Sequence, residues 1–576
     1  TSTEVGNVHG NFAGMGDGAT LDEASKFTQP NQNTRVRGLT SADNTRDYFM
    51  TDIPWDGYSV DAVDLQRGPN SILFGQGSPA GIINTRTKQA SFRNANEVTV
   101  RFGSFGSKRA TLDLNRVLIK DQLALRIAAL SDDEEYKQDP AYQSQKRIYG
   151  ATRWEPGFLK KGSARTIVTA NFEAGDVSSN RPRSVPPIDA ITPWFQGGTY
   201  EGNYVYNAST GDWDSQRTFN NLNRGTFIPA QLQDDNTGTP NHGQMRPSIN
   251  GGPTSGTPNP AYQPWLGNFG QQYGGPLEFY NVGDTTPMGV WVAEPKQMGG
   301  INADGQIDNT LALAYQRPAS VSTYSVFAKN AQLPFASEGI WKDKVLTDPS
   351  VFDFYNKLLD GPNKKEWQKF RAYNLSLVQT FFDDQAGFQL IYNNEWSKRG
   401  QLSLMSGSSQ GIYIDVNSVY ADGTPAGVGG EPYADGTPNP NVGRAFVTGN
   451  GISGNNESVN TKESSRATVF LKHDFTRDGG GLIHRILGVQ TINGLAAQDK
   501  FKSDYRQWQR YAIIDPNYDR LITGTGAPLK ISANELVPNT VVYLSDSLSS
   551  RASACGANLS KPTAVQIVTS GTVRTY

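Results

Sequence analysis

The side chains best suited to catalysis or metal binding are few in this chain and form no recognisable constellation. The four histidines, His9, His242, His473 and His484, are scattered, and no two of them stand at a spacing typical of metal ligands. The single cysteine, Cys555, cannot form an intramolecular disulfide, and we interpret it as an incidental small residue. No two carboxylates stand out as an acid and base pair. The sequence therefore predicts no metal site, no cofactor and no enzymatic activity.

Residues suited to binding are more common, in a stretch rich in Gly, Pro and aromatic residues that runs from Val177 to about Gln306. Aromatic rings offer flat apolar faces with polar edges, which suit sugars or aromatic metal chelates, and arginines attract anions. The candidate ligand-binding residues are Arg181, Arg183, Trp194, Phe195, Trp213, Trp265 and Tyr280. An alternative stays open for each of them, since the rings could pack within the stretch and the arginines could be solvated.

Composition indicates what kind of structure positions these residues. The chain has 576 residues with 60 Gly and 32 Pro, aromatic residues make up 10%, and the mean hydropathy is −0.53. This favours many turns and short strands over helices. The 53 Lys and Arg residues nearly balance the 55 Asp and Glu residues, so bulk charge predicts no nucleic-acid partner. No run of about 18 apolar residues predicts a transmembrane helix.

From Glu97 onward, apolar and polar residues alternate, which is typical of strands with one apolar and one polar face. The alternation covers residues 97–102, 109–115, 123–129, 165–173, 371–382, 388–396, 466–475 and parts of 486–511. A soluble sandwich and a membrane barrel share this local pattern. The connections favour the barrel, because short turns at 119–122 and 157–162 flank a longer polar segment at 132–144. An irregular stretch as long as 178–306 also suits an outer loop better than a compact soluble domain.

The most distinctive stretch runs from Val60 to Lys88. Its first extended run ends at residues 67–69, because Gly permits positive φ and Pro fixes φ and lacks an N–H. A short apolar run follows, and Gly and Pro residues at 75–81 let the chain double back before a β-branched run at 82–85.

This stretch resembles the end of the plug domain of TonB-dependent outer-membrane transporters. The matching positions are Val63, Asp64, Leu65, Arg67, Gly68, Pro69, Leu73, Phe74, Gly75, Gly81, Ile83, Asn84, Thr87 and Lys88. Upstream, residues 35–39 resemble the "IRG" element of the same plug, and residues 51–54 resemble its "DGIP" element without the glycine. Three matches in the family's order are far more specific than a lone Gly-rich loop.

The resemblance implies a membrane all-β fold, an antiparallel transmembrane β-barrel with a small α+β plug domain in its lumen. We assign residues 1–94 to the plug and 95–576 to the barrel, with a hinge within 89–96 and a long extracellular loop at about 178–306. Barrels of this type have about 22 strands, and the sequence supports roughly nine or ten. We therefore expect a fragment that lacks the signal peptide, the TonB box and the closing strands.

The resemblance also implies TonB-dependent active uptake of a scarce ligand, a ferric siderophore-type chelate or an oligosaccharide, across the bacterial outer membrane. The implied partners are TonB with ExbB and ExbD, outer-membrane lipid and the small ligand, and we expect a monomer. In the family the motif arginines lock the plug to barrel carboxylates, for which Glu173 and Glu395 are possible partners here. The residues assigned to the plug motifs and the lock are Arg35, Arg37, Gly38, Arg67, Gly68, Pro69, Gly75, Gly81 and Asn84.

Three alternatives remain at this point. The motif arginines could merely hold the turns of the plug together. The whole protein could be a passive porin-like barrel, which would not need the plug motifs. It could also be a secreted carbohydrate-binding or carbohydrate-hydrolysing β-protein, which would dissolve without detergent. The sequence does not identify the ligand.

Overall fold

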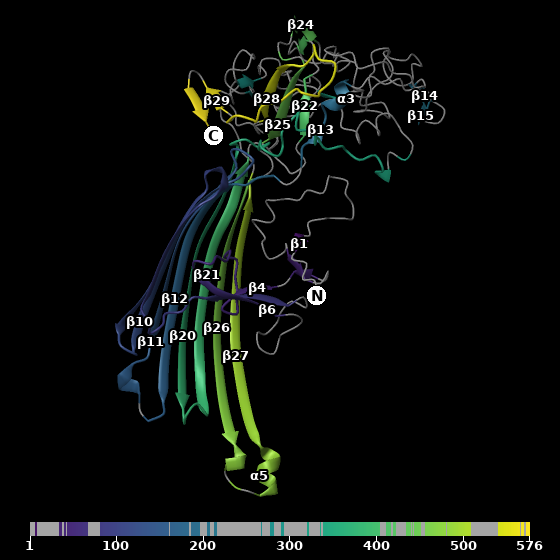
Figure 1. Cartoon of the computed structure of the whole chain (residues 1–576). Helices are drawn as coiled ribbons and strands as arrows, with labels where there is room; N and C mark the ends of the chain where they lie inside the picture. The colour runs from purple at the N-terminus through teal and green to yellow at the C-terminus, as the bar shows by residue number, and fades with distance from the viewer. Residues whose placement is uncertain are drawn as a thin grey trace, which may run out of the picture.

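The structure is a computed structural model of the chain. It describes residues 43–66, 81–160, 162–183, 186–195, 338–403, 411–415, 443–450, 455–477, 481–508 and 539–564, with isolated positions and short strands elsewhere. Strands dominate this part of the chain (Figure 1). Among the residues that the structure describes, no helix is long and apolar enough to cross a membrane.

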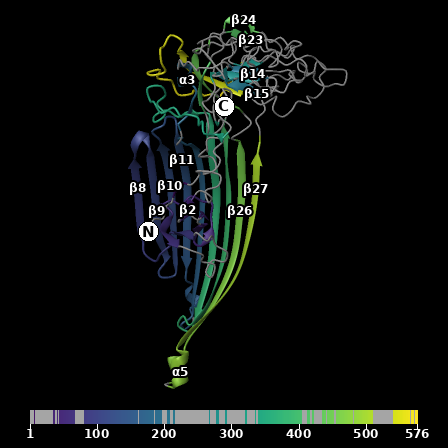
Figure 2. The ribbon, with the colours of Figure 1, turned by 90° about the vertical axis from the view of Figure 1, so that its right-hand side faces the viewer.

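The largest element is a nine-stranded sheet, here called the wall, in which every pair of neighbours is antiparallel. Its strands in spatial order are β8 (Ala95–Phe102), β9 (Lys108–Ile119), β10 (Leu123–Glu135), β11 (Tyr142–Trp154), β12 (Arg165–Asn180), β20 (Lys364–Phe381), β21 (Ala386–Ser403), β26 (Asn456–Asp474) and β27 (Val489–Gln507). Figure 2 shows a curved wall with β8 and β27 at its two edges. These two strands do not pair within the described residues, so the sheet is open there. The prediction of a partial antiparallel barrel is confirmed in this form.

The predicted alternating segments lie in strands of the wall, with two corrections. The connection predicted at 132–144 is wrong in length, because β10 continues to Glu135 and β11 begins at Tyr142. Its polar residues are paired across the sheet, as when Asp132 accepts hydrogen bonds from Arg109 and Gln145. The first residues of the segment 486–511 belong to a helix, α5 (Leu482–Leu487), and not to β27.

Connections differ between the two ends of the wall. At the lower end in Figure 1, β9–β10 and β20–β21 are joined by short turns. The other two lower connections contain a 3₁₀ turn, η3 (Gly157–Leu159), and a second one, η8 (Phe475–Arg477), followed by α5. At the upper end, η2 (Ser104–Gly106) and residues 136–141 make two short connections, whereas 181–363 and 404–455 make two very long ones. This asymmetry agrees with the predicted pattern of short turns and long outer loops.

The long upper connections and the residues that follow β27 build a second body, here called the outer subdomain (186–195, 340–363, 411–415, 443–450 and 541–564). A six-stranded sheet runs through it, in the order β13 (Ile188–Asp189), β22 (Gly411–Ile414), β25 (Arg444–Asn450), β28 (Asn539–Ser547), β17 (Leu277–Tyr280) and β18 (Val290–Val292). The short helix α3 (Thr192–Phe195) packs beside it. Its core includes Trp194, Phe352, Leu359, Ile412 and Phe446, each at most 1% exposed.

Several two-residue to five-residue strands complete the list of elements. They are β14 (Tyr204–Asn207) with β15 (Asp212–Ser215), β16 (Leu266–Gly267) with β19 (Ser320–Val321), β23 (Val419–Ala421) with β24 (Ala434–Pro438), and β29 (Gln566–Thr569) with β30 (Thr572–Thr575). A three-stranded sheet of β1 (Gly6–Asn7), β2 (Thr34–Val36) and β3 (Thr40–Ser41) lies near the N-terminus.

The plug motifs form a four-stranded mixed sheet in the order β5 (Phe49–Met50), β4 (Asp43–Arg46), β7 (Ile82–Thr87) and β6 (Val60–Gln66). Strand β4 is parallel to β7, and β6 is antiparallel to it. Gly81 adopts a φ of 107°, and its carbonyl accepts a hydrogen bond from the Asp43 N–H at 3.0 Å, so glycine is favoured at this entry to β7. Within 43–66 and 81–94, the plug consists of strands, turns and bends without a helix. It lies beside the wall at mid-height (Figure 1).

Candidate functional site at the plug–wall interface

Alternation along the strands gives the wall two different faces. On the inner face, side chains from β9, β10, β11, β12, β20, β21 and β26 reach the plug or the linker that follows it, and most of them are polar. The outer face carries the large exposed apolar side chains Val98, Val100, Phe102, Ile127, Ile148, Phe172, Tyr373, Leu375, Leu390, Val469, Leu471 and Ile492. A soluble sheet would solvate its polar face and bury its apolar one. The wall instead exposes its apolar face and buries its polar face against the plug.

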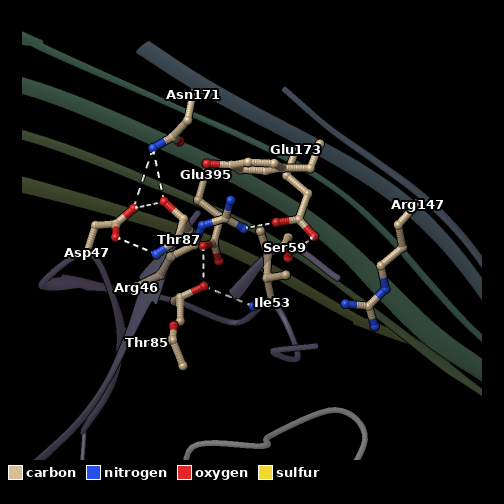
Figure 3. A network of polar contacts seen from close by, with 12 residues as sticks. Arg46, Asp47, Ile53, Ser59, Thr85, Thr87, Arg147, Asn171, Glu173 and Glu395 are labelled. Carbon is tan, nitrogen blue, oxygen red and sulfur yellow. Dashed lines mark hydrogen bonds and ion pairs between the residues drawn. The ribbon is translucent and has the colours of Figure 1, made fainter. Parts of the chain in front are cut away.

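Glu173 on β12 is the first centre of the interface and is 1% exposed. Its carboxylate accepts hydrogen bonds from the Arg46 guanidinium, the Tyr58 hydroxyl at 2.6 Å and, more weakly, the Ser59 hydroxyl at 3.4 Å. The three donors come from β4 and from the turn before β6, so one wall carboxylate holds two separate parts of the plug (Figure 3). Charge-assisted hydrogen bonds of this kind are stronger than neutral ones.

Asp52 is the second centre, with the charges reversed. This plug carboxylate is 7% exposed and is bound by Lys462 at 2.8 Å, Arg399 at 2.9 Å and the Asn460 amide at 2.9 Å. Lys462 and Asn460 project from β26 and Arg399 from β21, so the turn at 51–56 spans two wall strands. The Asp52 carbonyl also accepts a hydrogen bond from Gln368 on β20 at 3.1 Å.

Glu395 on β21 reinforces this second centre through neutral donors. One carboxyl oxygen accepts the Thr51 hydroxyl at 2.5 Å and the other accepts the Asp52 backbone N–H at 2.6 Å. Two carboxyl groups, Asp52 and Glu395, are thus held side by side on neighbouring donors. Glu395 therefore holds the plug turn in place through two hydrogen bonds, one to a side chain and one to the backbone.

The rest of the interface is a chain of ion pairs along β9, β10 and the linker. Arg109 forms a bidentate contact with Asp56 at 2.5 and 3.0 Å and also contacts Asp132 at 2.7 Å. Further along, Asp113 binds both Lys88 at 2.9 Å and Arg126 at 2.7 Å. These contacts extend the interface from the plug to the residues that join it to β8.

The remaining contacts between plug and wall include further hydrogen bonds and one apolar cluster. Asp47 accepts the Thr87 N–H at 2.9 Å and its hydroxyl at 2.7 Å, and the Asn171 amide joins them from β12 (Figure 3). The Arg147 guanidinium on β11 donates to the Pro54 carbonyl at 2.6 Å. A small apolar cluster forms where Ile53 packs against residues of β12 and β20. The interface is therefore continuous, and its polar part is larger.

The pKa values of the plug groups follow from these contacts. Burial alone would raise the pKa of the Asp52 carboxyl, but the charges of Arg399 and Lys462 outweigh it and lower the pKa below its ordinary value. The pKa of Asp56 is lowered in the same way, with burial opposed by the hydrogen bond from Arg109. Burial and the nearby Glu173 carboxylate raise the pKa of the Tyr58 hydroxyl, which keeps it protonated as a donor.

The structure places only part of the predicted plug motif. Arg37, Gly38, Arg67, Gly68, Pro69 and Gly75 lie outside the described residues, and only the backbone of Arg35, in β2, is described. Asn84 is fully buried, and its side-chain oxygen accepts the Thr45 hydroxyl at 3.0 Å and the Tyr48 N–H at 2.8 Å. It therefore braces the plug sheet itself. The lock formed by Arg37 and Arg67 stays a prediction, although Glu173 and Glu395 do both contact the plug.

The predicted ligand-binding residues are placed in different surroundings. Trp194 is 1% exposed in the core of the outer subdomain, with Phe195 packed against it at a ring-centroid distance of 4.8 Å. Arg183 forms a bidentate pair with the fully buried Asp360, both contacts at 2.6 Å, and the Arg181 side chain is 29% exposed near Glu366. For Trp213 and Tyr280 only the backbone is described, in β15 and β17, and Trp265 lies outside the described residues.

The interface contacts of Arg46, Asp52, Asp56, Arg109, Arg399 and Lys462 were not predicted from the sequence, although Asp52 lies in the plug element at 51–54. Among the three wall residues, only Arg109 lies in a segment predicted as a strand, where its parity and charge indicate an inner-face position. Arg399 and Lys462 lie beyond the predicted segments 388–396 and 466–475, because β21 and β26 are longer than the alternation indicated. Among the described residues no group of histidine, cysteine, aspartate and glutamate side chains could hold a metal ion.

Comparison with known proteins agrees with this architecture. No protein-family model matches the chain. By sequence it is 26% identical over 126 residues to the ferrichrome outer membrane transporter and phage receptor of Escherichia coli, which covers 22% of this chain and 16% of that protein. It is 28% identical over 101 residues to a metal-pseudopaline receptor of Pseudomonas aeruginosa, which covers 17% of this chain and 14% of the relative.

A solved structure, the pyoverdine outer membrane receptor of Pseudomonas aeruginosa, aligns with 83% of this chain and 42% of its own, at 11% identity and a TM-score of 0.35. A third relative, the ferrioxamine receptor of Yersinia enterocolitica, is 22% identical over 159 residues, which covers 28% of this chain and 21% of that protein. With these relatives, the resemblance to the TonB-dependent outer-membrane receptor family is confirmed. The matched regions span less than a quarter of the length of these relatives.

Proposed function

We propose that this chain is part of an outer-membrane transporter that imports a metal chelate of siderophore type by TonB-dependent active transport. The observation that carries the proposal is the inverted polarity of the wall. Its outer face exposes a band of large apolar side chains, such as Phe172 at 44% and Ile492 at 67%, whereas its inner face buries carboxylates and arginines against the plug. An apolar exterior with a polar lumen suits a sheet surrounded by lipid.

The plug argues for gated transport over a passive porin. A porin needs an open aqueous lumen, whereas here Glu173 and Asp52 hold a separate sheet against the inner face through buried ion pairs. The third alternative, a secreted carbohydrate-binding or carbohydrate-hydrolysing protein, requires a water-compatible surface. Twelve large apolar side chains exposed on one face of the wall argue against it.

For the ligand, we favour a metal chelate over an oligosaccharide. The relatives are named for ferrichrome, pseudopaline and ferrioxamine, which supports this choice of class. Ligand contacts would come from the upper end, where Arg181 offers a partly exposed guanidinium. Arg183, Phe195, Trp213, Trp265 and Tyr280 remain candidates, while Trp194 supports the site from within the core. TonB, with ExbB and ExbD, would supply the energy through the full-length protein, which would act as a monomer in the outer membrane.

The test is uptake by the full-length protein in a bacterium that lacks its own chelate receptors. Cells are offered a panel of ⁵⁵Fe-labelled chelates, with and without a functional TonB. The proposal expects accumulation of at least one chelate, which disappears without TonB or after collapse of the proton gradient. Uptake that persists without TonB would favour the porin alternative. Recovery of the protein as a soluble, detergent-independent species would overturn the membrane assignment.

A further inference from the structure

The lower connection between β26 and β27 differs from the other lower turns, because it contains the helix α5 (Figure 1). The chain leaves β26 through η8, enters α5 at Leu482 and returns at Gly488, whose φ of 55° ends the helix. The Phe475 N–H donates to the Gly488 carbonyl at 3.0 Å and closes the connection. The helix is thus a defined element at the lower tip of the two longest strands of the wall.

The helix separates apolar from charged residues. At 3.6 residues per turn, Leu482, Ile483, Ile486 and Leu487 fall on one side, and Arg485 falls on the other. The three most exposed of them, Leu482, Ile483 and Ile486, are 74%, 70% and 72% exposed. Isolated exposed apolar side chains are common, but four on one side of a single helix form a patch.

The apolar outer face of the wall reaches to within one outward-facing cross-strand pair, His473 and Gln490, of the connection that contains this patch. Leu471 on β26 and Ile492 on β27 are cross-strand partners, at 52% and 67% exposure. They lie on the outer face because Asn460, which binds Asp52 on the inner face, has the opposite parity to Leu471. The other lower turns also end in exposed apolar side chains, which are Leu118, Ile119, Phe158, Leu159, Phe381 and Phe382.

We propose that α5 is a membrane-interface helix that lies in the phospholipid headgroup layer at the lower rim of the wall. Its apolar side faces the acyl chains, and Arg485 reaches the headgroup phosphates. The inference rests on the proposed function, which places the outer face of the wall in lipid. The nearby apolar outer face, the exposed apolar side chains of the other lower turns and the basic residue on the opposite side of the helix favour a lipid surface over a protein partner.

The experiment uses the full-length protein in nanodiscs of phosphatidylethanolamine and phosphatidylglycerol, with Cys555 and any other native cysteine changed to serine. Single cysteines are introduced as Ile486→Cys, Arg485→Cys and Ile492→Cys, and each is labelled with the environment-sensitive fluorophore NBD. Quenching by brominated acyl chains is then measured for each label. Circular dichroism confirms that each variant retains its sheet content. Ile492 reports on the wall and Arg485 is the matched control on the opposite side of the same helix.

The proposal expects quenching at Ile486 close to that at Ile492 and roughly twice or more that at Arg485. Quenching at Ile492 with none at Ile486 would overturn the role of α5 and leave the transport proposal intact. No quenching at either position would overturn the membrane placement of the wall, and with it the proposed function. If the Ile486 label were shielded from water but not quenched by lipid, and became exposed to water on dilution of the protein, the patch would be assigned to contact with a second copy of the chain instead.

Discussion

The plug–wall interface and the outer subdomain are both buried, but they are built from different chemistry. The interface centres on charged groups, with Glu173 and Asp52 each bound by several donors. The outer subdomain centres on apolar side chains such as Ile412 and Phe446, which are fully buried. The plug lies against the middle of the wall strands and the outer subdomain lies at their upper end, so the two regions share one scaffold (Figure 1).

The difference indicates what each region can do. An apolar core loses most of its stabilisation as soon as it is opened to water, and it opens as a unit. A buried ion pair gains little net free energy over an apolar contact of equal size, but it fixes geometry, and its charged groups can be hydrated when they separate. The interface thus fixes the position of the plug but allows the plug to separate from the wall. The outer subdomain is expected to stay folded.

The largest expected effect is the release of the plug by Glu173→Ala. Arg46 and Tyr58 would remain buried without their acceptor, and we expect a loss of about 3–5 kcal/mol from the plug–wall contact. Hydrogen exchange should accelerate at residues 43–60 and stay unchanged at 541–548 in the outer subdomain. Glu173→Gln is the matched control, since it keeps the size of the side chain and an acceptor. Equal acceleration in both regions would contradict the distinction between them.

Leu359→Ala should produce the complementary result. Leu359 is fully buried in the core of the outer subdomain, and its truncation should cost about 2–5 kcal/mol through lost burial and a cavity. Exchange should accelerate at 412–414 and 541–548, with the plug amides protected as before. Val345→Ala is the control, because Val345 is 43% exposed in the same body. If the plug loosened as well, the two regions would be one cooperative unit.

Acid should weaken the plug contact. Because the pKa of Asp52 is lower in the folded protein than in the unfolded chain, its stabilising contribution is complete above the ordinary aspartate value of about 4. That contribution is lost as the pH falls through the lower, folded value. The urea midpoint for plug release, read from a fluorophore on the plug, should fall between pH 6 and pH 3. The same shift in Asp52→Asn would show that other groups cause it.

The smallest effect is expected at a carboxylate on the same strand as Glu173 but on the opposite face of the wall. Asp176 on β12 pairs with Lys369 at 3.0 Å on the outer side, with both side chains 55% exposed. Asp176→Asn should therefore change stability by about 0–1 kcal/mol in detergent. The denaturation midpoint of Asp176→Asn should lie close to the wild-type value, whereas that of Glu173→Ala should shift strongly. The two carboxylates, three residues apart, would then differ in their effect because one is buried and the other exposed.

Much of the wall could be predicted from the sequence, because strand alternation is a local property. The segments around 97–102, 109–115 and 388–396 were placed correctly from polarity alone. β11 was missed, and the neighbouring connection was drawn too long, because its polar residues resemble a loop until their cross-strand partners are known. The plug motif likewise indicated strands β6 and β7 on either side of a Gly-rich bend.

Most of the strands, the polarity of their two faces and the resemblance of the plug could thus be predicted from the sequence. Which charged groups contact one another depends on the tertiary structure. Asp52 contacts Arg399 and Lys462 because the register of β21 and β26 places Arg399 opposite Ser458 and Lys462 opposite Glu395, so the two cations reach the same carboxylate from opposite directions along the inner face. Such contacts join a plug turn to strands hundreds of residues away in the sequence, and a register shift of one residue would turn each wall side chain to the other face. No local pattern around Asp52 contains that information.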